Sequence, residues 1–163
     1  MKRFGLLLLA FFWLAQAQAG NDAVRSWSTD QPLDTAYKTV YKHLEDNRFF
    51  VVFEPDIQSN LSRFAERWGE DYNRNKLEGI RAMVFCNGWY ANQVSNADPT
   101  MLALCPLHVT LIREQGHTRV LFVRPSQIAA GSKAQAIARE LEEEVAKAID
   151  GAIDELRGCP TTC

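Results

Sequence analysis

The residues of this chain best suited to chemistry lie in one stretch, MVFCNGWYANQVSNADPTMLALCPLHVTL, from Met83 to Leu111. It contains two cysteines, Cys86 and Cys105, and the histidine His108. Two thiolates and an imidazole are ligands that suit Cu(I) or Zn(II). Two cysteines in an oxidising compartment would instead pair as a disulfide that supports the fold. The stretch therefore indicates either a reactive or binding site or a structural link.

Aromatic and amide side chains follow Cys86 directly, at Asn87, Trp89 and Tyr90. Rings beside a few polar groups are what small-molecule pockets use. The same rings could equally cover the sheet, since aromatic residues dominate protein cores. The hypothesis for binding is a small-ligand site formed by Cys86, Asn87, Trp89, Tyr90 and His108.

Cys86 closes one apolar run, and Cys105 precedes the next. If the two runs are antiparallel neighbours, both cysteines lie at the same end of the sheet, where Cα atoms about 5.5 Å apart can be bridged. The sequence therefore predicts a Cys86–Cys105 disulfide. The alternative is a thiol-redox or soft-metal protein that uses Cys86, Cys105 and His108 with copper or zinc. No C-x-x-C or H-x-x-x-H spacing supports a metal site, so no cofactor is predicted.

The chain ends in CPTTC, with Cys159 and Cys163. This spacing is one residue longer than the C-x-x-C of redox centres, and it follows a helix end, where the helix dipole raises a thiol pKa. The pattern favours a small disulfide ring, or pairing with Cys86 or Cys105, over chemistry. Four cysteines allow three connectivities, and the sequence selects none of them.

The first residues, MKRFGLLLLAFFWLAQAQAG, have the three parts of a secretory signal peptide. Lys2 and Arg3 are positive, an apolar core follows, and small residues precede a cleavage site placed after Ala19. The predicted organisation is a signal peptide over 1–19, one domain over 20–158 and a cysteine-containing tail over 159–163. We expect a periplasmic or secreted protein with no membrane span after cleavage.

Removing residues 1–19 leaves 144 residues, the size of one ordinary domain, and a formal net charge of −4. No basic stripe is present, so the chain lacks the footprint of a nucleic-acid-binding protein. The expected partner is a small molecule or another protein, and the sequence leaves open whether the chain forms homo-oligomers.

Hydrophobic patterning predicts an α+β fold with a mainly antiparallel sheet. Asn47 is expected to end the first helix in a left-handed turn. Acidic residues on the predicted helices, such as Glu66 and Glu142, are interpreted as solvated faces. We expect strands at 23–29, 49–54, 80–86, 107–114 and 118–125, and helices within 30–47, 60–69, 89–94 and 132–158.

Three segments, LEDNRFFVVFEPDI, GIRAMVFCN and LALCPLHVTLIRE, resemble blocks of the bacterial and archaeal family called domain of unknown function 302. The resemblance covers about residues 23–155. It implies a β-α-β4-α sheet similar to the TATA-binding-protein-like fold, with short inserted helices, and it implies no reaction. Cys86 and Asn87 fit the first cysteine-asparagine pair of the family. Leu107 and His108 stand where the family has a second such pair, with Cys105 displaced to before the proline.

No Ser-His-Asp arrangement, glycine-rich phosphate loop or pair of buried carboxylates can be recognised, so the sequence supports no enzyme class. It favours a non-enzymatic binding or accessory domain.

Overall fold

The computed structural model describes residues 22–158. Five strands within this range form one antiparallel sheet in the order β1-β5-β4-β3-β2. The strands are β1 (Val24–Thr29), β2 (Phe50–Phe53), β3 (Gly79–Cys86), β4 (Leu107–Glu114) and β5 (His117–Val123). The α+β class and the single antiparallel sheet predicted from the sequence are confirmed. The predicted signal peptide (1–19) and the tail with Cys159 and Cys163 lie outside the described residues.

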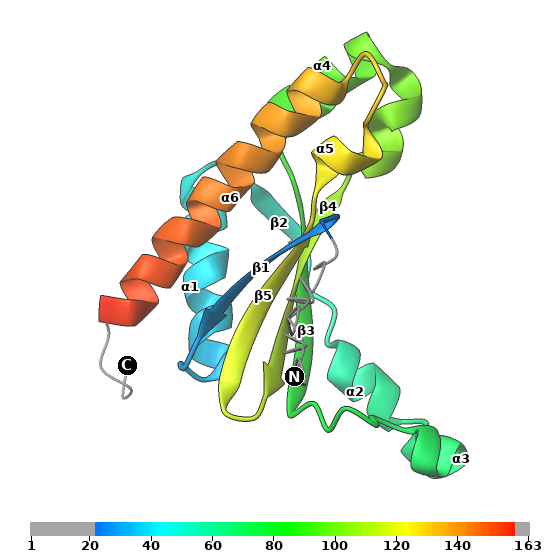
Figure 1. The fold of residues 1–163 in the computed structure, drawn as a ribbon, viewed down its shortest axis with the longest axis vertical. Helices are drawn as coiled ribbons and strands as arrows, with labels where there is room; N and C mark the ends of the chain where they lie inside the picture. Colours follow the sequence, from blue (N-terminus) through cyan, green and yellow to red (C-terminus); the bar gives the residue numbers. More distant parts are fainter. Residues whose placement is uncertain (1–21, 159–163) are drawn as a thin grey trace, which may run out of the picture.

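Two long helices, α1 (Leu33–Asp46) and α6 (Gln135–Gly158), lie side by side on one face of the sheet (Figure 1). Each carries an apolar stripe at helical spacing, because residues three or four apart share a face. Val40 of α1 and Ile149 of α6 are fully buried there against strand residues such as Phe85 and Val109. The core is this single layer between helices and sheet.

Shorter elements interrupt this frame. They are α2 (Ile57–Ser62), α3 (Ala65–Trp68), η1 (Gly69–Asp71), α4 (Gly88–Ala97), η2 (Pro99–Leu104) and α5 (Pro125–Ile128). In Figure 1, α2 and α3 project away from the sheet, while α4 and α5 lie at the end of the sheet where α6 begins. The order is therefore β-α-β4-α with short insertions, as the family resemblance implied.

Three local predictions were wrong. The helix predicted over 60–69 is two short helices, and α2 begins earlier because the Asp56 carboxylate accepts the Ser59 N–H (2.9 Å). The left-handed residue after α1 is Arg48 (φ 64°), one position beyond Asn47. The helix α5 was not predicted at all.

The predicted solvated face of α6 fails at Glu142, whose side chain is 4% exposed. Its carboxylate accepts hydrogen bonds from Arg124 Nε (2.7 Å), from the Ser126 N–H (3.3 Å) and from the Ser126 hydroxyl. Burial alone would raise the pKa of Glu142, but these hydrogen bonds outweigh burial and lower it. The carboxylate thus fastens the end of β5 and the start of α5 to α6.

Candidate functional site

Three adjoining hollows lie at one end of the sheet, where β2 begins, β3 ends, β4 begins and β5 ends. We name them the His108 cavity, the cysteine hollow and the aromatic hollow. Leu107 lines both the His108 cavity and the cysteine hollow, and Asn87 lines both the cysteine hollow and the aromatic hollow. The antiparallel pairing of β3 with β4 produces this arrangement, since it places Phe85 opposite Leu107.

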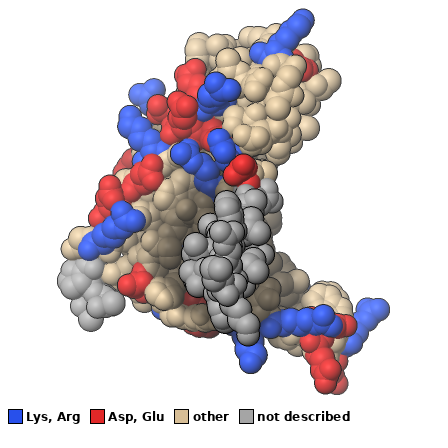
Figure 2. All heavy atoms as spheres, in the orientation of Figure 1, with Lys and Arg blue, Asp and Glu red and all other residues tan. Residues whose placement is uncertain are grey.

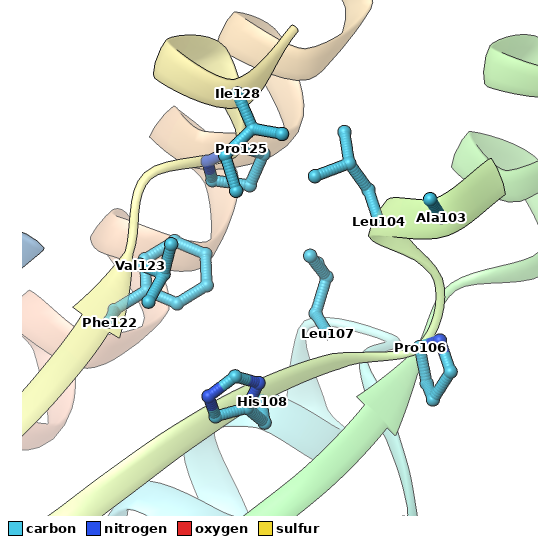
Figure 3. Close-up of a pocket in the computed structure, with 9 residues that line it drawn as sticks. All are labelled: Ala103, Leu104, Pro106, Leu107, His108, Phe122, Val123, Pro125 and Ile128. Atoms are coloured by element: carbon cyan, nitrogen blue, oxygen red, sulfur yellow. The ribbon is translucent and has the colours of Figure 1, made fainter. Parts of the chain in front are cut away.

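The His108 cavity has a volume of about 120 Å³ and a mainly apolar lining. Its walls come from η2, from the two strands β4 and β5 and from α5. They are formed by Ala103, Leu104, Pro106, Leu107, His108, Phe122, Val123, Pro125 and Ile128. Figure 3 shows Leu104, Leu107 and Pro125 around one shared space, with the His108 ring along its lower side.

His108 is the only titratable side chain among the residues that line this cavity. Strand alternation places it opposite to its neighbours: His108 is exposed, whereas Leu107 and Val109 are buried. This orientation follows from the alternation of side chains along a strand. An exposed imidazole at the side of an apolar cavity can donate or accept one hydrogen bond, depending on its tautomer.

Glu142 of α6 holds in place the wall of the cavity that α5 forms. The helix begins at Pro125, between the two residues that Glu142 binds, Arg124 and Ser126. At its far end, Ile128 is 55% exposed, a large apolar side chain beside an apolar cavity. Figure 2 shows that the surface near α4 and α5 carries few charged side chains, whereas charges gather along α6 and around α2 and α3.

The cysteine hollow lies on the other side of Leu107, and at about 10 Å³ it has room for about one water molecule. Cys86 and Cys105 both line it, together with Tyr90. The two cysteines are thus brought to the same end of the sheet as expected, but both are free thiols. The predicted Cys86–Cys105 disulfide is therefore wrong. The chain returns through α4 and η2 to the same hollow, but the two sulfur atoms are not bonded.

The surroundings of Cys105 disfavour its thiolate form. Burial, and then the neighbouring Cys86, raise the pKa of Cys105, so its thiolate is scarce at neutral pH. Within residues 22–158 no group of three or more His, Cys, Asp or Glu side chains could hold a metal ion. Cys86, Cys105 and His108 therefore do not form the three-ligand site considered for copper or zinc.

Asn87 and Tyr90, two of the residues predicted to bind a small ligand, also have structural roles. Asn87 caps α4, since its side-chain oxygen accepts the N–H groups of Trp89 (3.0 Å) and Tyr90 (3.2 Å). Tyr90 stacks on Phe49, with ring centroids 6.4 Å apart, and its hydroxyl binds Glu140 (3.0 Å). Burial and this carboxylate raise the pKa of Tyr90 to about 12.

The five predicted ligand residues are therefore divided among the three hollows. Cys86 and Tyr90 lie in the cysteine hollow, Trp89 in the aromatic hollow and His108 in its own cavity, while Asn87 lies between the first two. Sequence reasoning missed the opposite wall of the His108 cavity, formed by Phe122, Val123, Pro125 and Ile128. The local signal in the sequence was Pro125, since proline is common at the first position of a helix.

Comparison with known proteins gives the family and the fold. Residues 25–156 match the family model described as "Domain of unknown function DUF302". The fold is similar to that of an uncharacterised conserved DUF302 protein from Bacillus stearothermophilus, with a TM-score of 0.68 and 17% identity. The match covers 79% of this chain and 97% of that one, and at this identity the likeness shows the fold alone. None of the curated proteins compared matches the chain.

Within the part of the chain that the structure describes, no helix is both long enough and apolar enough to span a bilayer.

Proposed function

The chain belongs to the DUF302 family, which is described as a domain of unknown function, and we propose that it is a non-enzymatic domain that binds a small ligand in the His108 cavity. The observation that carries the proposal is the cavity itself. It is an apolar space of about 120 Å³ between four elements, with a single imidazole along its side. Concave apolar sites with a few polar groups are the usual form of small-molecule sites.

The size of the cavity sets the class of ligand. Apolar protein cavities of about 150 Å³ take up a benzene molecule. At about 120 Å³, the His108 cavity fits one small ring, with any polar substituent directed toward His108. We therefore propose a ligand that presents a single apolar ring and one uncharged hydrogen-bonding group.

The binding is expected to be weak for such a fragment. A ligand of about seven non-hydrogen atoms binds with about 4–5.5 kcal/mol when it gains roughly 0.6–0.8 kcal/mol per atom, within the known range. That free energy corresponds to a dissociation constant between about 0.1 and 1 mM. A larger natural ligand would gain more by extending past Ile128, whose exposed side chain adjoins the cavity.

Phenol is a suitable probe, because it combines one ring with one hydroxyl group. Titration followed by methyl NMR should give saturable shifts at Leu104, Leu107 and Ile128. Ala103 is an exposed residue in the lining of the cavity, and a larger side chain there should occupy part of the space. Ala103→Leu should therefore weaken phenol binding at least fivefold. Leu102→Phe is the matched control, because Leu102 lies on the same helix but outside the lining. Equal affinity in the two variants would contradict the proposal.

A polar contact from the imidazole is tested separately. His108→Ala should weaken phenol binding while leaving benzene binding unchanged, because benzene cannot form the hydrogen bond. If phenol and benzene lose affinity equally, His108 contributes apolar contact area to the site and no hydrogen bond to the ligand.

We also propose that the domain acts outside the cytoplasm, after cleavage of residues 1–19. The support is the sequence pattern of a positive start, an apolar core and small residues before Gly20. Mass spectrometry of the protein from a periplasmic fraction should give a chain that begins at Gly20. A full-length chain in the cytoplasmic fraction would contradict export.

A further inference from the structure

The aromatic hollow is a second concave site, on the far side of Asn87 from the cysteine hollow. It is open, has a volume of about 310 Å³, and is lined by Arg48, Phe50, Asn87, Gly88 and Trp89. Both of its rings are unusually exposed for their type, Phe50 at 55% and Trp89 at 65%. Large apolar side chains grouped at the surface mark interaction sites.

Arg48 is the only charged residue in the lining of this hollow. Its guanidinium makes no ion pair with any residue in the range 22–158. The two carboxylates at the end of α1 have other partners: Asp46 pairs with Lys42 (3.1 Å), and Glu45 accepts the Val51 N–H (2.7 Å). The hollow therefore offers an uncommitted positive charge.

The backbone holds Arg48 in place at a conformational cost. Its φ of 64° lies in the left-handed region, which a residue with a Cβ adopts rarely and unfavourably. The Asn87 side-chain amide donates to the Arg48 carbonyl (3.1 Å), and the Arg48 N–H donates to the Glu45 carbonyl (2.9 Å). Glycine would fit this turn without strain, whereas the arginine found here places a long charged side chain in the lining of the hollow.

We propose that the aromatic hollow binds a flat ring that carries a carboxylate, such as an aromatic acid. The ring would lie against the exposed faces of Phe50 and Trp89, because aromatic pairs gain from stacked or edge contacts beyond area burial. The carboxylate would pair with the Arg48 guanidinium, whose planar fork matches its two oxygens. Gly88 leaves room for the ligand, since a Cβ built there meets no atom within 4 Å. This site is independent of the His108 cavity.

The probe is benzoate, with benzyl alcohol as its uncharged counterpart. In amide and indole NMR spectra, benzoate should shift the Trp89 indole N–H and the Gly88 amide saturably. The indole signals of Trp27 and Trp68 serve as internal references, because neither residue lines the hollow. Benzyl alcohol should bind at least fivefold more weakly.

Two matched substitutions distinguish a direct contact with the Arg48 guanidinium from an effect of the net charge of the protein. Arg48→Gln should weaken benzoate binding at least fivefold, whereas Arg63→Gln, which removes an exposed arginine elsewhere, should leave it unchanged. Arg48→Gly removes the guanidinium and relieves the strain, so it should weaken benzoate while raising the melting temperature. Equal benzoate affinity in Arg48→Gln and wild type, or shifts at Leu107 rather than Trp89, would overturn the proposal.

Discussion

Replacing Glu142 by glutamine should destabilise the domain by about 2–3 kcal/mol at neutral pH. The buried carboxylate meets three donors, Arg124 Nε, the Ser126 N–H and the Ser126 hydroxyl, with two oxygens. The amide keeps one oxygen and turns its NH₂ group toward one of these donors. At least one charge-assisted hydrogen bond is lost, and such bonds contribute about 1.5–3 kcal/mol. The loss of stability stays below that expected for a fully buried ion pair, because the Arg124 side chain is 31% exposed and water can solvate it.

The pH dependence gives this prediction a second readout. The folded-state pKa of Glu142 lies below its ordinary value of 4.5. Its contribution to stability is therefore fully present above that value and is lost as pH falls through the lower, folded-state pKa. The difference between wild type and Glu142→Gln should be constant from about pH 6 to 7 and shrink below about pH 4.5.

Urea unfolding measures both effects, provided that the slope with denaturant stays the same in the two proteins. Glu143→Gln is the matched control, since Glu143 is the exposed neighbour on α6 and should change stability by less than about 0.5 kcal/mol. A loss below about 0.5 kcal/mol for Glu142→Gln, or a loss that persists unchanged at pH 3, would show that the ionised carboxylate does not stabilise the fold through these hydrogen bonds.

Three further predictions follow from single features of the structure. Arg48→Gly should raise the free energy of unfolding by about 0.5–1 kcal/mol, because glycine fits a φ of 64° without strain; a decrease would contradict this. Phe85→Ala, at a fully buried site, should cost about 3–5 kcal/mol, while Phe53→Ala, at a 63% exposed site, should cost under about 0.5; equal urea midpoints would contradict this. Alkylation of the urea-unfolded protein without reductant, read by peptide mass, should label both Cys86 and Cys105, and joined peptides would show a disulfide instead.

Elements that depend on long apolar repeats were predictable from the sequence. Val40 and Leu44 follow the helical period of α1, and Leu107, Val109 and Leu111 follow the strand period of β4, so burial of one face dictates each element. Gln115 and Gly116, both at positive φ, form the turn of the β4–β5 hairpin. The exposed position of His108 followed from the same alternation.

Features that depend on contacts across the fold were not predictable. Glu142 sits on a helix rich in acids, and only the approach of Arg124 and Ser126 from the end of β5 makes it a buried partner. The far wall of the His108 cavity is α5, a four-residue helix too short to leave a periodic pattern. Sequence order placed Cys86 and Cys105 at one sheet end, but the pairing of their sulfur atoms depends on local geometry that no spacing rule gives.

Binding of a small ring in the His108 cavity can be measured by a phenol titration followed at the Leu107 methyl groups. Leu107 lines the cavity and is 8% exposed, so its signals are sensitive to a probe inside the cavity. We expect saturable shifts with a dissociation constant between about 0.1 and 1 mM in wild type and in Leu102→Phe. Binding in Ala103→Leu should be at least fivefold weaker. Linear, non-saturating shifts in wild type, or identical curves for the two variants, would contradict binding in this cavity.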